Sequence, residues 1–241
     1  MSASPPTLVA VPCFSGAPWD ERQLAPLSEY PVRTMRLPEA LADVEQYADF
    51  LATQVEGLSD YVLVGDSFGG VISLVLALRQ PTGLRGLVVS GGFAANPLPR
   101  WKGVAGRASR HARGPLYRQL TLRFHARQLA SRFDRTAEVP HHRDDYRRLF
   151  VENTPSDSYS ARVTSVISFD VRDHLAKVQV PTLLITPADD RLVGERAARD
   201  LRQGLLDARE MVLPETGHMF RFTHPGLYGQ TILEFVHQLA R

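Results

Sequence analysis

The sequence predicts an α/β fold, in which a mostly parallel central sheet is flanked by helices and carries an inserted helical cap. Short apolar, β-branched runs alternate with amphipathic helical patterns, and this alternation favours parallel strands joined by helices. The alternation stops after residue 93 and resumes near residue 171. We therefore expect one core made of residues 1–93 and 171–241, with residues 94–170 as a helical cap.

The first part of the core contains four strand patterns and two long helix patterns. The runs that are apolar and β-branched, as buried strands are, cover residues 7–11, 32–37, 61–64 and 84–90. Residues 39–56 place apolar side chains at steps of three and four before Gly57, which predicts an amphipathic helix. Residues 68–80 predict a second, buried helix that ends before Pro81.

The rest of the chain predicts further helices in the cap and then a return to alternation. In the cap, helix patterns cover residues 115–133 and 142–152. Strands are expected at 180–186 and 208–213, and helices at 195–206 and 223–240. In a parallel sheet the carboxyl ends of the strands share one edge, so the loops that follow them are where we look for chemistry.

Length and composition limit the class of protein. A chain of 241 residues can bury one sizeable core, and no apolar run approaches the roughly 20 residues of a membrane span. The N-terminal residues lack a basic start followed by an apolar stretch, so we expect no secretory signal. Cys13 is the only cysteine, which excludes an internal disulfide and favours the cytoplasm. The expected state is a monomer or a small homo-oligomer.

The charge is distributed unevenly. Residues 94–150 contain thirteen Lys/Arg against four Asp/Glu, whereas the rest of the chain contains fifteen against twenty-two. One interpretation is a landing surface for a polyanionic carrier such as acyl carrier protein, coenzyme A or an anionic lipid surface. The other is a set of solvated, Arg-rich helix faces. The basic segment contains no recognisable nucleic-acid-binding fold, so nucleic acid is not expected as a partner.

The stretch Gly65-Asp66-Ser67-Phe68-Gly69 joins a strand pattern to a helix pattern. A sharp turn between a strand and a helix strains its apex residue, and small neighbours let the chains pass closely. This is the Gly-x-Ser-x-Gly arrangement that exposes a nucleophilic serine. Ser67 is therefore the predicted nucleophile.

A serine hydroxyl needs a base within hydrogen-bond reach, and the base needs an orienting group. The loop after residues 180–186 offers Asp189 and Asp190, and the loop after residues 208–213 offers His218 beside Gly217. We expect Gly217 to let the chain bend so that His218 turns toward Ser67. No other histidine follows a strand beside a glycine; His125 and the rest are interpreted as structural or surface residues, and His141-His142 lacks the companion ligands of a metal site.

In this order and spacing, these motifs resemble those of the α/β-hydrolase superfamily over nearly the whole chain. The family's acid precedes a valine by three residues, which implies Asp190 as the acid and leaves Asp189 as a solvated turn carboxylate. The resemblance also implies an oxyanion hole made by the backbone N–H groups of Phe68 and Phe14. The chain departs from the family pattern here, because Pro12 and Cys13 stand where His-Gly is common. No cofactor or metal is implied.

The compact chain and the position of its cap are similar to the small carboxylesterases that act on pimeloyl-acyl-carrier-protein methyl ester. The resemblance implies hydrolysis of a small-molecule ester, free or carried on acyl carrier protein or coenzyme A, through an acyl-Ser67 intermediate. Trp19, Met219 and Phe220 are expected to contact the substrate's apolar part, with plain core packing as the alternative for each of them. Two alternatives stay open: the same triad acting as a thioesterase, amidase, lactonase, C–C hydrolase or perhydrolase, and a non-catalytic ligand-binding protein on the same scaffold.

Overall fold

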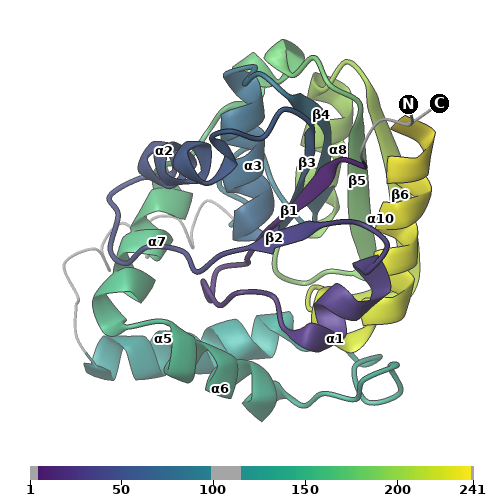
Figure 1. Ribbon diagram of the computed structural model, residues 1–241. Helices are drawn as coiled ribbons and strands as arrows, with labels where there is room; N and C mark the ends of the chain where they lie inside the picture. Colours follow the sequence, from purple (N-terminus) through teal and green to yellow (C-terminus); the bar gives the residue numbers. More distant parts are fainter. Residues whose placement is uncertain (1–4, 99–114, 240–241) are drawn as a thin grey trace.

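The computed structural model describes residues 5–98 and 115–239, and within them six parallel strands form one sheet in the order β2-β1-β3-β4-β5-β6 (Figure 1). The strands are β1 (Thr7–Val11), β2 (Val32–Thr34), β3 (Tyr61–Asp66), β4 (Leu84–Ser90), β5 (Thr182–Asp189) and β6 (Ala208–Gly217). The predicted α/β fold is therefore confirmed. Because every pairing is parallel, all strands end at the same edge of the sheet.

Helices cover both faces of the sheet. They are α1 (Glu21–Leu24), η1 (Ala25–Leu27), α2 (Val44–Val55), α3 (Phe68–Leu78), η2 (Arg172–Lys177), α8 (Gly194–Gly204), α9 (Phe220–Thr223) and α10 (Pro225–Leu239). Side chains alternate along β1: Val9 packs with α2, α3 and α8 on one face, whereas Leu8 packs with α10 on the other. The central strand β3 is buried along its whole length, which explains its unbroken apolar run.

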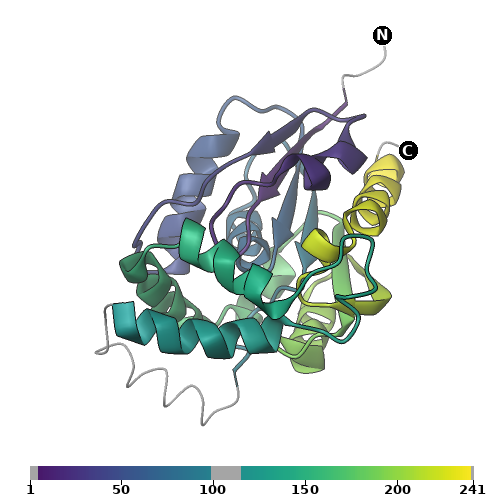
Figure 2. The ribbon, with the colours of Figure 1, turned by 90° about the horizontal axis from the view of Figure 1, so that it is seen from below.

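Between β4 and β5, three of the α-helices in the described part of the chain lie across the edge where the strands end. We call α5 (Pro115–Leu129), α6 (Arg143–Asn153) and α7 (Ser156–Ser168) together the helical segment. Seen from below, this segment lies in front of the sheet (Figure 2). The chain leaves the core after β4 and returns to it before β5 at neighbouring positions, because Ala95 and Asp170 form an antiparallel bridge. The division into core and cap stays a prediction. Residues 99–114 of the predicted cap lie outside the described part of the chain.

Helix α7 was missed by the sequence analysis. Its buried face carries Ser158, Arg162 and Ser165 beside Tyr159 and Ile167, so an apolar period is hardly visible in the sequence. The other two helices of the segment lie where they were predicted, although α5 ends at Leu129 rather than near residue 133.

Several predicted boundaries were wrong by a few residues. Strand β2 ends at Thr34 rather than residue 37. Helix α2 begins only at Val44, because Ala40 has a positive φ of 49° and the Asp43 side chain caps the helix by accepting from the Gln46 N–H. Strands β5 and β6 run on to Asp189 and Gly217, so the predicted acid and base follow directly after a strand. Among the described residues, no helix is long and apolar enough to cross a membrane.

Candidate active site

Ser67 lies at a sharp turn between β3 and α3. Its φ of 53° and ψ of −113° are strained for a residue with a Cβ. The turn is crowded: a Cβ on Gly69 would lie 2.3 Å from the carbonyl oxygen of Val11, and one on Gly65 would lie 2.5 Å from that of Gly69. Glycine is required at both positions by space, so the strand-to-helix turn predicted from them is present.

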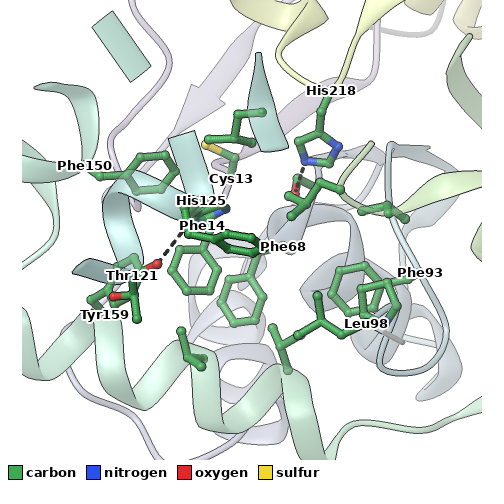
Figure 3. A pocket seen from close by; sticks show the side chains of 18 of the residues that line it. Cys13, Phe14, Phe68, Phe93, Leu98, Thr121, His125, Phe150, Tyr159 and His218 are labelled. Atoms are coloured by element: carbon green, nitrogen blue, oxygen red, sulfur yellow. Dashed lines mark hydrogen bonds between the residues drawn. The ribbon is translucent and has the colours of Figure 1, made fainter. Parts of the chain in front are cut away.

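Ser67, His218 and Asp190 form a continuous hydrogen-bond chain. Figure 3 shows a hydrogen bond of His218 as a dashed line. The Ser67 Oγ lies 2.8 Å from Nε2 of His218, and Nδ1 of His218 lies 2.7 Å from Oδ2 of Asp190. An ionised carboxylate only accepts hydrogen bonds, so Nδ1 carries the proton and Nε2 accepts from the Ser67 hydroxyl. Residues 67, 190 and 218 are far apart in sequence and come together because β3, β5 and β6 run parallel and end at the same edge of the sheet.

The structure separates the two neighbouring aspartates. Asp190 faces His218, and its other oxygen accepts from the backbone N–H groups of Leu192 and Val193, each at 2.9 Å. Asp189 turns away and accepts from the Ser131 hydroxyl at 2.8 Å. The expectation of a solvated turn carboxylate at Asp189 was therefore wrong, because its side chain is only 23% exposed and joins β5 to the loop after α5.

Asp190 and His218 shift each other's pKa. Burial alone would lower the pKa of His218, but the Asp190 carboxylate, and with it that of Asp66, raises this pKa above the ordinary 6.5. Burial would likewise raise the pKa of Asp190, yet His218 and two backbone N–H groups hold it below its usual value. Asp190 is therefore held in its ionised form, and His218 is the more basic of the two groups.

Gly217 serves a different purpose from the one predicted. It does not adopt a positive φ, whereas a Cβ there would lie 2.3 Å from the Cβ of Ser131. The glycine is needed so that the end of β6 can pass close to the loop after α5. His218 is directed toward Ser67 by the parallel course of β6 and by the bond to Asp190.

A buried ion pair lies behind Ser67, and it was not predicted from the sequence. Arg221 Nε donates to Asp66 Oδ2 at 2.6 Å, and both side chains are almost fully buried. The same guanidinium donates to Gln23 and contacts Cys13 Sγ at 3.5 Å. Asp66 precedes Ser67, Arg221 follows His218 by three positions, and Cys13 is in the loop after β1. One guanidinium on α9 therefore bonds both the end of β3 and the loop after β1.

A cavity of about 390 Å³ lies beside Ser67 (Figure 3). One side, which we call the sheet wall, comes from the loops after β1, β3 and β6 and includes Cys13, Phe14, Ser67, Phe68, His218 and Met219. The facing side, the helical wall, comes from α5, α6 and α7 and includes Thr121, His125, Leu129, Phe150, Tyr159 and Val163. Apolar and aromatic side chains make up most of the cavity's surface.

Of the residues predicted to contact the substrate, only Met219 lines the cavity. The prediction for Trp19 and Phe220 was wrong, because both side chains pack on the other side of the loops, against Tyr228 of α10. Conversely, His125 was interpreted as a structural or surface residue, yet it lines the cavity. A lone histidine in a basic, weakly amphipathic helix carries no sequence signal for such a position.

Phe14 and Phe68, the predicted oxyanion residues, both line the cavity beside Ser67. Their rings contact each other edge to face, with centroids 5.7 Å apart. The loop that carries Phe14 is held by Arg162 of α7, whose guanidinium donates to the Phe14 carbonyl at 2.7 Å. The role of the two backbone N–H groups stays a prediction. Within residues 5–98 and 115–239, no group of three or more His, Cys, Asp or Glu side chains is placed to hold a metal ion.

The chain is similar in sequence and in fold to known hydrolases. A family model described as "Serine aminopeptidase, S33" matches residues 30–222, a span that contains Ser67, Asp190 and His218. A "Putative carbamate hydrolase RutD" of Caulobacter sp. (strain K31) is 30% identical over 223 residues, which cover 85% of this chain and 75% of the relative. A pimeloyl-acyl-carrier-protein methyl ester esterase of Neisseria meningitidis is 27% identical over 201 residues, covering 80% and 75%. The crystal structure of a hydrolase from Pseudomonas aeruginosa superposes with a TM-score of 0.80 at 18% identity, covering 98% of this chain and 91% of the other.

Proposed function

The chain belongs to the serine aminopeptidase S33 family of α/β hydrolases, and from that premise we propose that it cleaves carboxylic esters through an acyl intermediate on Ser67. The observation that carries the proposal is the hydrogen-bond chain from Ser67 through His218 to Asp190. A serine hydroxyl aligned on an imidazole, which is itself held by a carboxylate, has the arrangement needed to attack a carbonyl carbon.

In the proposed mechanism, His218 Nε2 takes the proton of Ser67 while Oγ bonds to the ester carbonyl carbon. The carbonyl oxygen becomes an oxyanion and accepts from the backbone N–H groups of Phe14 and Phe68. His218 then donates its proton to the leaving alcohol, and the acyl group stays on Ser67. A water molecule, deprotonated by His218, attacks the acyl carbon and releases the acid. Asp190 holds the Nδ1 proton and stabilises the imidazolium throughout.

The cavity favours an ester with an apolar acyl chain over the other substrates named in this family. An aminopeptidase needs an acceptor for the substrate's ammonium group. Among the described residues that line the cavity, the one carboxylate is Asp66, which is already engaged by Arg221. A carbamate is small and polar, whereas this cavity is roomy and mostly apolar.

We further propose that the helical segment acts as the substrate-covering cap, with the acyl chain between the two walls. Acyl carrier protein or coenzyme A as the carrier of the ester is supported by exposed arginines on the described part of the segment, including Arg123, Arg127 and Arg148. The basic residues at positions 100, 102, 107, 110 and 113 lie outside the described residues. A cytoplasmic location stays a prediction.

A fluorophosphonate probe tests the proposed function directly. We expect the probe to label Ser67 in the folded protein, and p-nitrophenyl butyrate and octanoate to be hydrolysed. Replacing the nucleophile of such a triad costs about 10⁶-fold in kcat, so Ser67→Ala should lose both activities. The matched control is Ser73→Ala, which removes a buried hydroxyl from α3 outside the cavity and should keep both.

The same assay includes proline p-nitroanilide as an aminopeptidase substrate. Faster turnover of the anilide than of the esters would overturn the ester assignment but keep the serine hydrolase. Folded protein that leaves Ser67 unlabelled and both substrate classes intact would overturn the whole proposal.

A further inference from the structure

The turn formed by residues 13–16 follows β1 and places Phe14 at the cavity. The core bonds two of its four carbonyl groups. The Cys13 carbonyl accepts from the Gly16 N–H within the turn at 2.9 Å, and the Gly16 carbonyl accepts from the N–H of Leu37 at 3.0 Å. The two carbonyls between them need donors from elsewhere, because a buried carbonyl without a donor costs free energy.

The helical segment supplies both of these donors. A guanidinium N–H of Arg162 on α7 donates to the Phe14 carbonyl at 2.7 Å. The hydroxyl of Thr154, the residue after α6, donates to the Ser15 carbonyl at 2.9 Å. The fit is close, since a Cβ on Gly16 would lie 2.7 Å from both terminal nitrogens of Arg162. The turn is therefore held by the segment that lies across the edge of the sheet.

Arg162 is buried, yet its hydrogen bonds in the described part of the chain go to neutral acceptors alone. It is 1% exposed, and besides the turn it donates to the Tyr47 hydroxyl at 3.2 Å and to the Pro38 carbonyl at 3.1 Å. The other fully buried guanidinium, that of Arg221, is paired with Asp66. A buried cation without a carboxylate is costly, and an apolar side chain of similar volume would avoid that cost. Stability alone is therefore a poor reason for an arginine here.

Two backbone N–H groups beside Ser67 have no hydrogen-bond partner among the described residues, namely those of Phe14 and Phe68. Phe68 is the first residue of α3, so its N–H has no partner within the helix. The Cys13 carbonyl points into the turn, and across a planar trans peptide the Phe14 N–H must point the opposite way, out of the turn. Both phenylalanines line the cavity (Figure 3).

We propose that Arg162, assisted by Thr154, is a positioning residue for the oxyanion: it fixes the turn so that the Phe14 N–H stays aimed at the oxygen on which charge develops. This rests on the proposed function, in which the N–H groups of Phe14 and Phe68 bind that oxygen. Arg162 does not line the cavity, so it acts through the turn and not on the substrate. The helical segment then takes part in catalysis as well as covering the substrate.

The variant Arg162→Met removes the donors and keeps much of the volume. We expect kcat for p-nitrophenyl octanoate to fall about 10- to 100-fold with KM nearly unchanged, since a misplaced donor weakens binding of the transition state alone. Heptyl trifluoromethyl ketone forms a tetrahedral oxyanion with a reactive serine, so its Ki should rise by the factor by which kcat/KM falls. The Ki of octanoic acid, which needs only the acyl cavity, should not change. A purely structural role would alter KM and the octanoic acid Ki instead.

A second variant keeps the test decisive if Arg162→Met does not fold. Thr154→Val keeps the shape of the side chain and removes the hydroxyl that bonds Ser15. Its kcat should fall about 3- to 10-fold, with the same pattern for the two inhibitors. The matched control is Tyr47→Phe, which takes one acceptor from Arg162 but leaves its bond to the turn. This control should lower the urea midpoint and keep kcat.

Unchanged kcat in folded Arg162→Met, or in Thr154→Val where Arg162→Met does not fold, would overturn the proposal. A loss of kcat in Tyr47→Phe as large as that in Arg162→Met would overturn it too, because the effect would then not come through the turn.

The two proposals can fail separately. If the wild-type protein hydrolyses esters and both variants do so at the same kcat, ester hydrolysis stands and the positioning role falls. If the wild-type protein cleaves the anilide in place of the esters, the ester assignment falls, and the same variants test Arg162 with the anilide, because acyl transfer to Ser67 passes through the same oxyanion. If Ser67 is not labelled and no acyl substrate is cleaved, both proposals fall.

Discussion

Two histidines face the same cavity from opposite walls, and their surroundings shift their pKa values in opposite directions. His218 on the sheet wall is bonded to Asp190, which outweighs burial and raises its pKa. His125 on the helical wall is packed among aromatic rings with a tyrosine hydroxyl as its polar partner, and its pKa falls to about 3. A carboxylate 2.7 Å away therefore makes one imidazole more basic. The other imidazole has no carboxylate partner among the described residues, and it is uncharged at neutral pH.

The difference extends to the walls themselves. The sheet wall holds its polar groups at strand ends, where Asp190 accepts from backbone N–H groups and Asp66 is bonded to Arg221. The helical wall contributes side chains from helices that pack on the core through an apolar cluster with Met219 and Phe14. Polar contacts, such as Ser131 with Asp189, add to this packing. We infer that the first wall performs the chemistry, whereas the second selects the substrate.

The largest predicted effect concerns Asp190. Asp190→Asn would let the ring adopt the wrong tautomer, and by analogy with other triads kcat should fall by about 10⁴-fold. Asp189→Asn is the matched control, because Asp189 bonds Ser131 rather than His218, and the amide oxygen still accepts from that hydroxyl. Steady-state hydrolysis of p-nitrophenyl octanoate measures both. If the two substitutions had equal effects, the assignment of Asp190 as the orienting acid would be wrong.

The next effect concerns the stability of the sheet wall. Arg221→Met leaves the Asp66 carboxylate buried without its partner, and removing one member of such a pair typically costs about 3–5 kcal/mol of unfolding free energy. Urea unfolding measures the loss, and the double variant Asp66→Asn/Arg221→Met should recover part of it.

The matched control for Arg221 is Arg172→Met. Arg172 pairs with Asp170 at the surface, with side chains 53% and 49% exposed, and exposed pairs contribute only about 0–1 kcal/mol. Losses of the same size in Arg221→Met and Arg172→Met would show that the buried pair does not stabilise the loops of the site.

The pH dependence distinguishes the two histidines. His218 must be neutral to accept the Ser67 proton, so kcat/KM should be level above the pKa of His218 and fall about tenfold per pH unit below it. Since this pKa is raised, the decline should begin above pH 6.5. His125 should add no second step, because it titrates only near pH 3.

Asp66→Asn sharpens the pH test. Removing a negative charge that raises the pKa of His218 should move the acid limb to lower pH while leaving its slope at one. An acid limb with a slope of two would mean that both histidines titrate, which contradicts the difference between the walls.

Much of the sheet wall was predictable because its determinants are local. The run at residues 61–64 and the glycines at 65 and 69 specify a buried strand, a tight turn and a helix within a few residues of one another. Asp190 and His218 each follow a strand, and parallel strands bring such positions to one edge. The candidate triad could therefore be named from the sequence, and its catalytic role stays a prediction.

The helical wall was far less predictable. The buried face of α7 consists largely of serines and Arg162, and α5 has no strong apolar period. Neither sequence pattern therefore indicates which side chains line the cavity. Trp19 and Phe220 illustrate the same limit in the core, because aromatic residues near the site in sequence point into the packing against α10 instead.

By itself, the sequence determined the α/β alternation, the turn at Ser67 and the succession of serine, acid and histidine, because period and turn chemistry are properties of neighbouring residues. Only the tertiary structure decided that Arg221 joins Asp66 across 155 positions, that Asp189 bonds Ser131 of a distant loop, and that His125 faces the cavity. These contacts depend on which faces of distant segments pack together, and a short-range pattern carries no record of that choice.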